Sequence, residues 1–388
     1  MSDDSHLPKY IKLGDFEPPA MPTQRAFQIL LSKSLLLFKK NKVGNEGAIS
    51  SDHLGKTSEA DLNNVAASPA YGPLLHALNQ NLSPYVSDLK SDSKVELIVL
   101  PPCDENDIIK TWAKHNKLEC LAPPTSQSIL SGRADSPVIG SGNTLVIPRL
   151  EAWMMRTHSS LNLIRQLLAA IESTERSVVI GCNVYAWEFL KKSVDAASFL
   201  PDPMTFDALD CDQLKDWFNT LYSSEKNNYK LFHQQTAQDI FADNDEGNDS
   251  YFKELAATSS GIPWVAWHLW RKSLLTNDHK ASDEGNDTPL VDDPNQHVLW
   301  VTALQEYALP DTKSNLPLLV LQAILIHHEI SIDHLVKVLP GIRALAAVSL
   351  LKRAGIINQE NGMLSCRPAA YPAIRQGLTA SGFPVGVV

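Results

Sequence analysis

The stretch from Lys94 to Trp112, KVELIVLPPCDENDIIKTW, constrains the fold of this chain more than any other. It opens with a β-branched and aliphatic run, 95–100, bounded by polar residues and prolines, which predicts a central parallel strand. It ends with Ile108, Ile109 and Trp112 at helical spacing. A strand, a tight turn and a helix in this order form the local structure on which α/β domains carry a phosphate-binding loop.

The turn between this strand and helix lacks the residues that bind phosphate. It reads Pro101, Pro102, Cys103, Asp104 and Glu105, with no glycine and no lysine. A phosphate loop needs glycines so that main-chain amides can surround the phosphates, and a lysine to neutralise them. Two carboxylates would repel a phosphate instead. We therefore expect only vestigial nucleotide contacts from Pro102, Cys103 and Asp104.

The single Gly-Lys-Thr sequence in the chain, 55–57, does not restore that loop. The motif requires a glycine five positions before Gly55, and Ser50 stands there. No apolar strand precedes it. We interpret it as a chance match.

Beyond this stretch the pattern alternates between strands and helices, which indicates a parallel sheet. The expected strands are 118–121, 144–147, 177–181 and 204–206. The expected helices are 105–116, 149–156, 160–173, 185–192 and 211–222.

The sequence predicts five segments. Residues 1–90 form an N-terminal arm, helix and flexible linker, 91–222 the α/β domain, and 223–276 a helical segment. An acidic linker, 277–296, then precedes a C-terminal domain, 297–388. The helix expected over 26–40 has an apolar side and lysines near its end, so it either packs on the next domain or contacts a membrane surface or partner.

Three motifs in order resemble the AAA+ and STAND class of phosphate-loop ATPases, near the archaeal-ATPase and origin-recognition branch. TLVIPRLEAW resembles the third strand with its acidic pair. SVVIGCNVYAWEFL and MTFDALDCDQLKDWF resemble the sensor strand and the elements leading to the lid. ELAATSSGIPWVAWHLW resembles the lid helix. The resemblance covers about 94–388 and implies a P-loop-NTPase-like α/β domain, a helical lid and a C-terminal winged-helix domain.

The resemblance fails at the catalytic positions. The positions of the magnesium-binding acid and the catalytic acid fall on Pro148 and Arg149, and neither can hold magnesium. Glu151 is expected on a helix that directs it away from the strand end. Cys182 or Asn183 matches the sensor position, and Asn183 could still hydrogen-bond a phosphate. The resemblance therefore implies an inactive relative with no metal and no cofactor, ATP being the only candidate.

The expected winged helix offers two readings. Its candidate recognition helix, 341–354, carries Arg343, Lys352 and Arg353 and no acid, and a turn at Asn361 forms the wing. DNA readers place basic and amide side chains toward the N-terminal half of that helix, whereas this one is mostly aliphatic. Protein docking is favoured over DNA reading. The expected core is Leu321, Ile324, Leu335, Leu345, Val348 and Leu351.

Two further groups of residues, a histidine pair and a set of tryptophans, are expected to have structural roles and not to form sites. His327 and His328 point to different faces of a helix, which makes a poor metal pair, and a helix-end position explains them better. The tryptophans at 264, 267 and 270 are expected to pack in a core rather than to stack on bases.

Composition limits the function classes. The net charge is −10, which argues against a nucleic-acid coat, and five scattered cysteines fit reduced thiols. No transmembrane segment or signal peptide is evident, so a cytoplasmic location is expected. The sequence predicts a non-catalytic regulatory or scaffolding protein that binds a protein partner. The alternatives are an ATPase with an unconventional or partner-completed site, and a winged-helix DNA-binding regulator.

Overall fold

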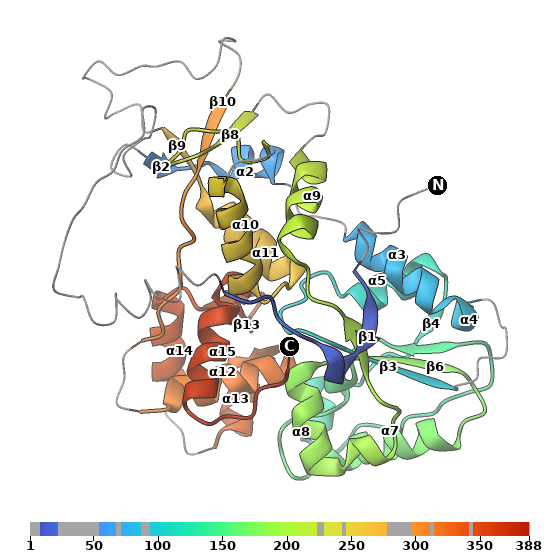
Figure 1. Cartoon of the computed structure of the whole chain (residues 1–388). Helices are drawn as coiled ribbons and strands as arrows, with labels where there is room; N and C mark the ends of the chain where they lie inside the picture. Colours follow the sequence, from blue (N-terminus) through green and yellow to red (C-terminus); the bar gives the residue numbers. More distant parts are fainter. Residues whose placement is uncertain are drawn as a thin grey trace. The chain divides into compact units, whose positions relative to one another are not determined.

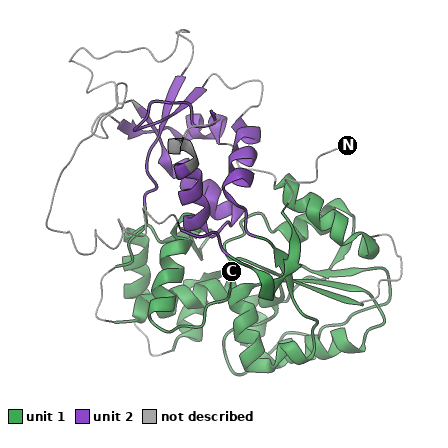
Figure 2. Ribbon diagram, in the orientation of Figure 1, with its two compact units in different colours: residues 1–17, 71–207, 306–388 green, residues 18–70, 208–305 purple. Residues whose placement is uncertain are grey.

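The computed structural model describes residues 8–21, 54–66, 71–86, 94–222, 229–242, 246–277, 297–310, 314–340 and 344–387. Three predictions concern residues outside this set. They are the helix over 26–40, nearly all of the acidic linker over 277–296, and the docking residue Arg343. The chain divides into two compact units (Figure 2). The first comprises 1–17, 71–207 and 306–388, and the second 18–70 and 208–305. These limits differ from those expected from the sequence, because 306–388 joins the α/β domain in one unit.

A six-stranded sheet forms the core of the first unit, in the order β1-β7-β3-β6-β5-β4. Its strands are β1 (Tyr10–Lys12), β3 (Val95–Leu100), β4 (Glu119–Cys120), β5 (Leu145–Ile147), β6 (Val178–Asn183) and β7 (Met204–Phe206). All neighbours pair in parallel except β1, which lies antiparallel to β7 at the edge. Strand β6 is buried along its whole length, as expected for a central parallel strand. The predicted mixed α/β fold with a parallel sheet is confirmed.

Helices cover both faces of this sheet. Figure 1 shows α3 and α5 on one side and α7 and α8 on the other. The helices are α3 (Gly72–Asn81), α4 (Ser83–Val86), α5 (Ile108–His115), α6 (Ser126–Leu130), α7 (Leu161–Ser173) and α8 (Val184–Val194). Three short 3-10 helices are η2 (Leu13–Asp15), η4 (Leu150–Trp153) and η5 (Ala196–Ser198).

The prediction of a helix over 149–156 is wrong, because only the short 3-10 helix η4 forms there. Arg149 gives its N-terminus no side-chain cap, and the backbone is extended again at Met154. The turn therefore stops after four residues, which changes the direction of the side chains it carries.

The strand order defines a switch point between β3 and β6. From β3 the chain crosses through α5 to β4 at one end of the sheet, whereas from β6 it crosses through α8 to β7 on the other side of β3. In open α/β sheets, ligands bind outside the carboxyl ends of two such strands. A ligand-binding site is thus expected at the ends of β3 and β6, at Leu100 and Asn183.

The C-terminal part of the first unit combines helices with a small antiparallel sheet, in the order β11-β13-β12. We call residues 314–387 the C-terminal module. Its elements are α12 (Leu316–His327), β11 (Glu329–Ser331), α13 (Ile332–Val338), α14 (Ala344–Arg353), β12 (Ile357–Glu360), β13 (Met363–Cys366), η6 (Pro368–Ala370) and α15 (Tyr371–Ala380). Asn361 and Gly362 both have positive φ, as a two-residue hairpin turn requires.

Helix α12 explains why the C-terminal module belongs to the first unit. It is apolar on nearly all sides, and every residue from Val320 to His327 is buried. A helix that is apolar all round needs neighbours on every side. It contacts α14 and α15 of the C-terminal module, and α8 and η4 of the α/β part.

One of the residues expected in the core of the C-terminal module lies on its surface. Leu345 is 57% exposed, while the other five expected core residues are buried. Ala344 and Ala347 of α14 are buried in its place. The apolar stripe of α14 is therefore rotated from the expected one.

The second unit contains a mixed sheet that the sequence did not predict. Its order is β2-β9-β10-β8, with β8 and β10 parallel and the other pairs antiparallel. The strands are β2 (Leu54–Lys56), β8 (Tyr229–His233), β9 (Leu274–Asn277) and β10 (His297–Val301), and the helices are α2 (Glu59–Val65), α9 (Cys211–Tyr222), α10 (Glu246–Ser259) and α11 (Pro263–Ser273). The expectation of a helical segment over 223–276 is wrong in part, because β8 and the start of β9 lie in it. The N-terminal segment that was expected to contain a flexible linker contains β2 and α2.

The Gly-Lys-Thr sequence lies in this unit. Gly55 and Lys56 pair with β9 as part of β2, so their backbone is engaged in a sheet. Thr57 donates its hydroxyl to the main-chain oxygen of Leu274. The segment is used structurally, in agreement with a chance match.

The tryptophans of α11 form a core in the second unit. Trp264, Trp267 and Trp270 are at most 6% exposed, and Trp270 stacks on Phe218 at a centroid distance of 4.5 Å. Their burial agrees with packing rather than base stacking. Within the described residues, helices that combine the length and apolarity of a membrane span are absent.

Candidate functional site

The carboxyl ends of β3 and β6 meet a small cavity of about 30 Å³. Its walls come from the turn after β3, the turn after β5, the end of β6 and the end of α12. They are formed by Leu100, Pro101, Asp104, Asp107, Ile109, Pro148, Arg149, Glu151, Cys182, Asn183 and His328. A cavity of this size holds one or two water molecules and is far below the volume of a small-molecule pocket.

Asp104 occupies the anion position at the start of α5. Its carboxylate accepts hydrogen bonds from the amides of Ile108, at 2.8 Å, and Asn106, at 3.1 Å. Amides at a helix N-terminus are the groups that bind phosphates in nucleotide sites. Here a side chain of the same turn satisfies them. Burial raises the pKa of Asp104 to about 6, although the amides and Arg149 act in the opposite direction.

Arg149 ties the turn after β5 to the turn after β3. One of its Nη atoms donates to the main-chain oxygen of Asp104 at 3.2 Å, and its Nε lies 3.3 Å from Oδ2 of Asp107. Both side chains of the ion pair are about one quarter exposed. The positive charge of the site therefore comes from Arg149, a residue of the turn after β5.

Glu151 points toward the strand ends, so the expectation that it points away is wrong. The side chain is 4% exposed, and its Oε2 accepts from the amide of Asn183 at 3.2 Å. The direction follows from η4, because a four-residue 3-10 turn rotates the residue differently from an α-helix. Burial raises the pKa of Glu151, while Arg149 opposes the change.

Gly181 allows the turn after β5 to approach β6. A Cβ atom at this position would lie 2.2 Å from the main-chain oxygen of Pro148. Any larger residue would push Pro148 and Arg149 off the strand end. Gly181 is thus a requirement of the site that the sequence did not mark.

Asn183 connects the α/β part with the C-terminal module. Its Oδ1 accepts from the amide of Ala186 and so caps α8, and its Nδ2 donates to the main-chain oxygen of Ile326 in α12 at 3.3 Å. His328 follows α12 with a φ of 64° and also lines the cavity. Burial, together with Arg149, lowers the pKa of His328 to about 3, so this histidine is neutral.

The predicted nucleotide residues are only partly brought together. Asp104 and Asn183 line the same cavity, whereas Pro102 and Cys103 are buried and do not line it. Their contact with a nucleotide stays a prediction. The sequence did not indicate that His328 lines this cavity, because nothing in its neighbourhood links the end of α12 to the sheet. The expectation that His327 and His328 lie at a helix end is confirmed, since His327 ends α12 and His328 caps it.

The predicted docking residues lie on the C-terminal module. Lys352 and Arg353 are exposed at the end of α14, and Asn361 is exposed at the hairpin turn. Lys352 donates to Oε1 of Gln359 at 2.7 Å. Among the residues that the structure describes, groups of acidic, histidine and cysteine side chains able to hold a metal ion are absent.

Comparison with known proteins gives distant likenesses only. No protein-family model matches the chain, and no curated protein matches it significantly. A variant of RuvB from Thermotoga maritima is 12% identical, with a TM-score of 0.33, over 80% of this chain and 95% of its own. Cdc6p from Pyrobaculum aerophilum is 11% identical, with a TM-score of 0.28, over 84% and 99%. The ORC2 protein of Aeropyrum pernix, solved in ADPNP–ADP complexes, is 12% identical, with a TM-score of 0.29, over 84% and 99%.

Proposed function

We propose that this chain is a non-catalytic regulatory or scaffolding protein, built on a degenerate module of the AAA+ and STAND type, that acts in the cytoplasm by binding a protein partner. One observation carries the proposal. At the switch point of the sheet, the chain's own side chains occupy the places of a phosphate and its counter-charge. Asp104 satisfies the amides at the start of α5, and Arg149 neutralises the turn.

Phosphoryl transfer requires charge neutralisation and precise positioning of the phosphates. The cavity offers two buried carboxylates, Asp104 and Glu151, whose raised pKa values reflect how little solvent reaches them. A triphosphate would meet Asp104 at the helix start and the end of α12 above β6. Admitting a nucleotide would require Arg149, Asp104 and α12 to move together.

The C-terminal module supports docking to protein. Its order of three helices and a hairpin agrees with a winged helix, in which α14 takes the recognition position. The exposed side of α14 carries Leu345, 57% exposed, and α13 carries Val336, 44% exposed. Exposed aliphatic side chains suit a protein surface better than a phosphate backbone.

Two measurements on the full chain test the proposal. A phosphate-release assay with ATP and magnesium should show no turnover, and titration with a fluorescent ATP analogue should show no saturable binding. Turnover that Arg149→Ala alters would instead establish the ATPase alternative. A pull-down should retain a protein partner that Leu345→Glu releases. Retention of the same partner by Leu345→Glu would contradict docking through α14.

A further inference from the structure

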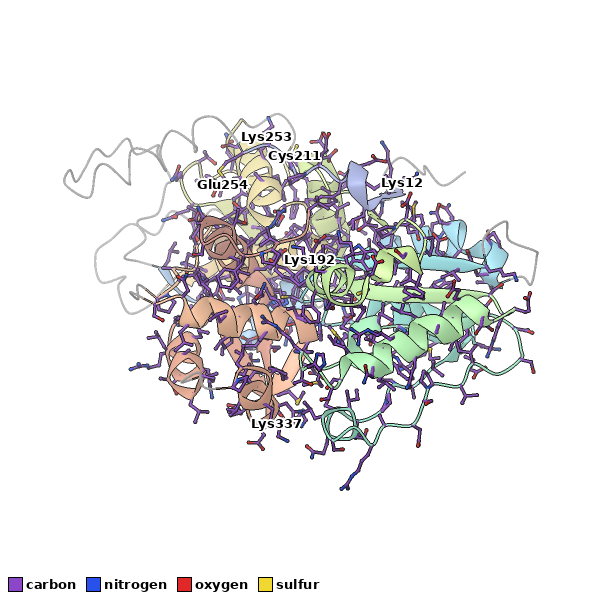
Figure 3. The ribbon with its side chains drawn as sticks, turned by 90° about the horizontal axis from the view of Figure 1, so that it is seen from below. Lys12, Lys192, Cys211, Lys253, Glu254 and Lys337 are labelled. Carbon is purple, nitrogen blue, oxygen red and sulfur yellow. The ribbon has the colours of Figure 1, made fainter. Side chains whose placement is uncertain are left out.

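A second cavity, separate from the strand ends, lies between α8 and α12. Its volume is about 260 Å³, close to the lower limit for small-molecule sites. Its walls are formed by Arg156, Tyr185, Glu188, Phe189, Lys192, Ser193, Gln322, Ile326 and Pro384. Figure 3 shows Lys192 on α8, on the side of the helices of the C-terminal module.

Arg156 brings an unpaired cation to this cavity. Its main-chain amide donates to Nε2 of His327, which fixes the residue beside α12. One Nη atom of its guanidinium is buried and has no hydrogen-bond partner. Burial also lowers the pKa of Arg156. A buried donor of a charged group without a partner is costly, so the position favours a ligand that accepts its hydrogen bond.

The charges around the cavity favour an anion. Lys192 adds a second positive charge, while the carboxylate of Glu188 is already engaged by Lys191 at 2.7 Å. The hydroxyl of Ser193 is buried and unpartnered, so it can donate to an acceptor. The cavity wall therefore contains two cations, one hydroxyl without a partner and one carboxylate that is already paired. This set leaves a surplus of positive charge and of hydrogen-bond donors.

Apart from the amide of Gln322 and the hydroxyl of Tyr185, the remaining wall is apolar. Phe189 and Ile326 face the cavity from the two helices, and Pro384 comes from the C-terminal tail. Arg375 holds that tail through hydrogen bonds to the main-chain oxygens of Gly386 and Val387. A ligand must therefore combine an anionic group with an apolar body. Inorganic anions would leave the apolar wall uncovered.

We propose that the cavity between α8 and α12 is a binding site for a small organic anion, whose charged group pairs with Arg156 and whose apolar part packs on Phe189 and Ile326. Such a ligand contacts both the α/β part and the C-terminal module. It stabilises their contact through linkage, since it binds the folded arrangement and not the separated parts. The site is independent of the strand ends and of the partner proposed above.

Isothermal titration of the full chain with four probes tests the site. Benzoate and phenyl phosphate present a carboxylate or a phosphate ester on an aromatic ring, benzamide is the neutral counterpart, and inorganic phosphate lacks the ring. We expect saturable binding of benzoate or phenyl phosphate, and affinities at least about tenfold lower for benzamide and inorganic phosphate. Binding of benzamide as tight as that of benzoate, or of inorganic phosphate as tight as that of phenyl phosphate, would overturn the proposal.

Variants locate the binding. Arg156→Gln keeps the main-chain bond to His327 and removes the charge, and should weaken binding about 10- to 100-fold. Ser193→Met fills the cavity and should have a similar effect. Arg133→Gln removes an exposed arginine elsewhere in the same unit and should bind as the unchanged protein does. Scanning calorimetry without ligand establishes that each variant folds. Equal affinity in Arg156→Gln and Arg133→Gln, or no binding of either aromatic anion to the unchanged protein, refutes the site.

Discussion

The side-chain amide of Asn183 donates to the main-chain oxygen of Ile326 across 3.3 Å. Asn183 ends β6 and caps α8, and Ile326 lies in the last turn of α12. The residue that ends β6 therefore binds the C-terminal module. This hydrogen bond connects the carboxyl end of β6, where a ligand would bind in an open α/β fold, to the end of α12.

Two substitutions at this position separate its roles. Asn183→Ala removes both the cap of α8 and the bond to α12, and should lower the free energy of unfolding by about 1–2 kcal/mol. Asn183→Asp keeps a capping oxygen but loses the donor to Ile326. Amide hydrogen exchange should therefore accelerate in α12 for both variants, and in the first turn of α8 for Asn183→Ala alone. Unchanged exchange in α12 would show that the bond does not hold the module.

Arg149→Ala should destabilise the first unit by about 1–3 kcal/mol. It breaks the ion pair with Asp107 and leaves the buried carboxylates of Asp104 and Glu151 without a nearby cation. The partial exposure of the pair keeps the effect below that of a fully buried one. Urea unfolding followed by circular dichroism measures it. Lys12→Gln breaks an exposed pair with Asp202 and should leave the midpoint unchanged.

Gly181→Ala should destabilise the protein by about 1–3 kcal/mol, because the added Cβ meets the main-chain oxygen of Pro148. Gly140→Ala is the matched control, since a Cβ there meets nothing within 4 Å. Thermal unfolding of both variants measures the difference. An equal change in the two would mean that the turn after β5 adapts at little cost.

These predictions depend on features that the sequence revealed to different degrees. The parallel sheet was predictable because its strands are continuous apolar runs between helices of regular period. The direction of Glu151 was not, since it depends on whether a short turn is 3-10 or α. Gly181 gave no signal either, because the atom it accommodates belongs to a turn 33 residues earlier in the chain (181 minus 148).

The sheet of the second unit was missed for a different reason. Its strands are short, and β9 follows α11 without a break, so the helical pattern continues into it. Leu54 pairs with Asn277, and Leu299 pairs with Thr276, so each partner is distant in sequence. Local periodicity contains no information about such pairings.

Asp104→Asn should change how stability depends on pH. The folded pKa of about 6 lies above the ordinary value of 3.8, so between these values the folded state binds more protons than the unfolded state. The contribution of Asp104 to stability is therefore complete below about pH 3.8 and is lost as pH rises through 6. Asparagine cannot ionise. Between pH 4 and 7 the free energy of unfolding of the variant should therefore rise by up to about 3 kcal/mol relative to that of the unchanged protein. Urea midpoints at several pH values measure this gain, and a constant difference would refute the pKa shift.

The last prediction concerns the exposed basic residues of α14. Replacing Lys352 and Arg353 with alanine should leave the weak retention of DNA, and its dependence on salt, nearly unchanged. Lys352 is engaged with Gln359, and the exposed side of α14 also carries the aliphatic Leu345. Fluorescence anisotropy with a short duplex, in salt from 50 to 200 mM, measures the slope. If both residues contact phosphates, the log–log slope should decrease by about 2 units, about one for each lost contact. That decrease, together with submicromolar affinity at physiological salt, would replace protein docking with DNA binding as the role of the C-terminal module.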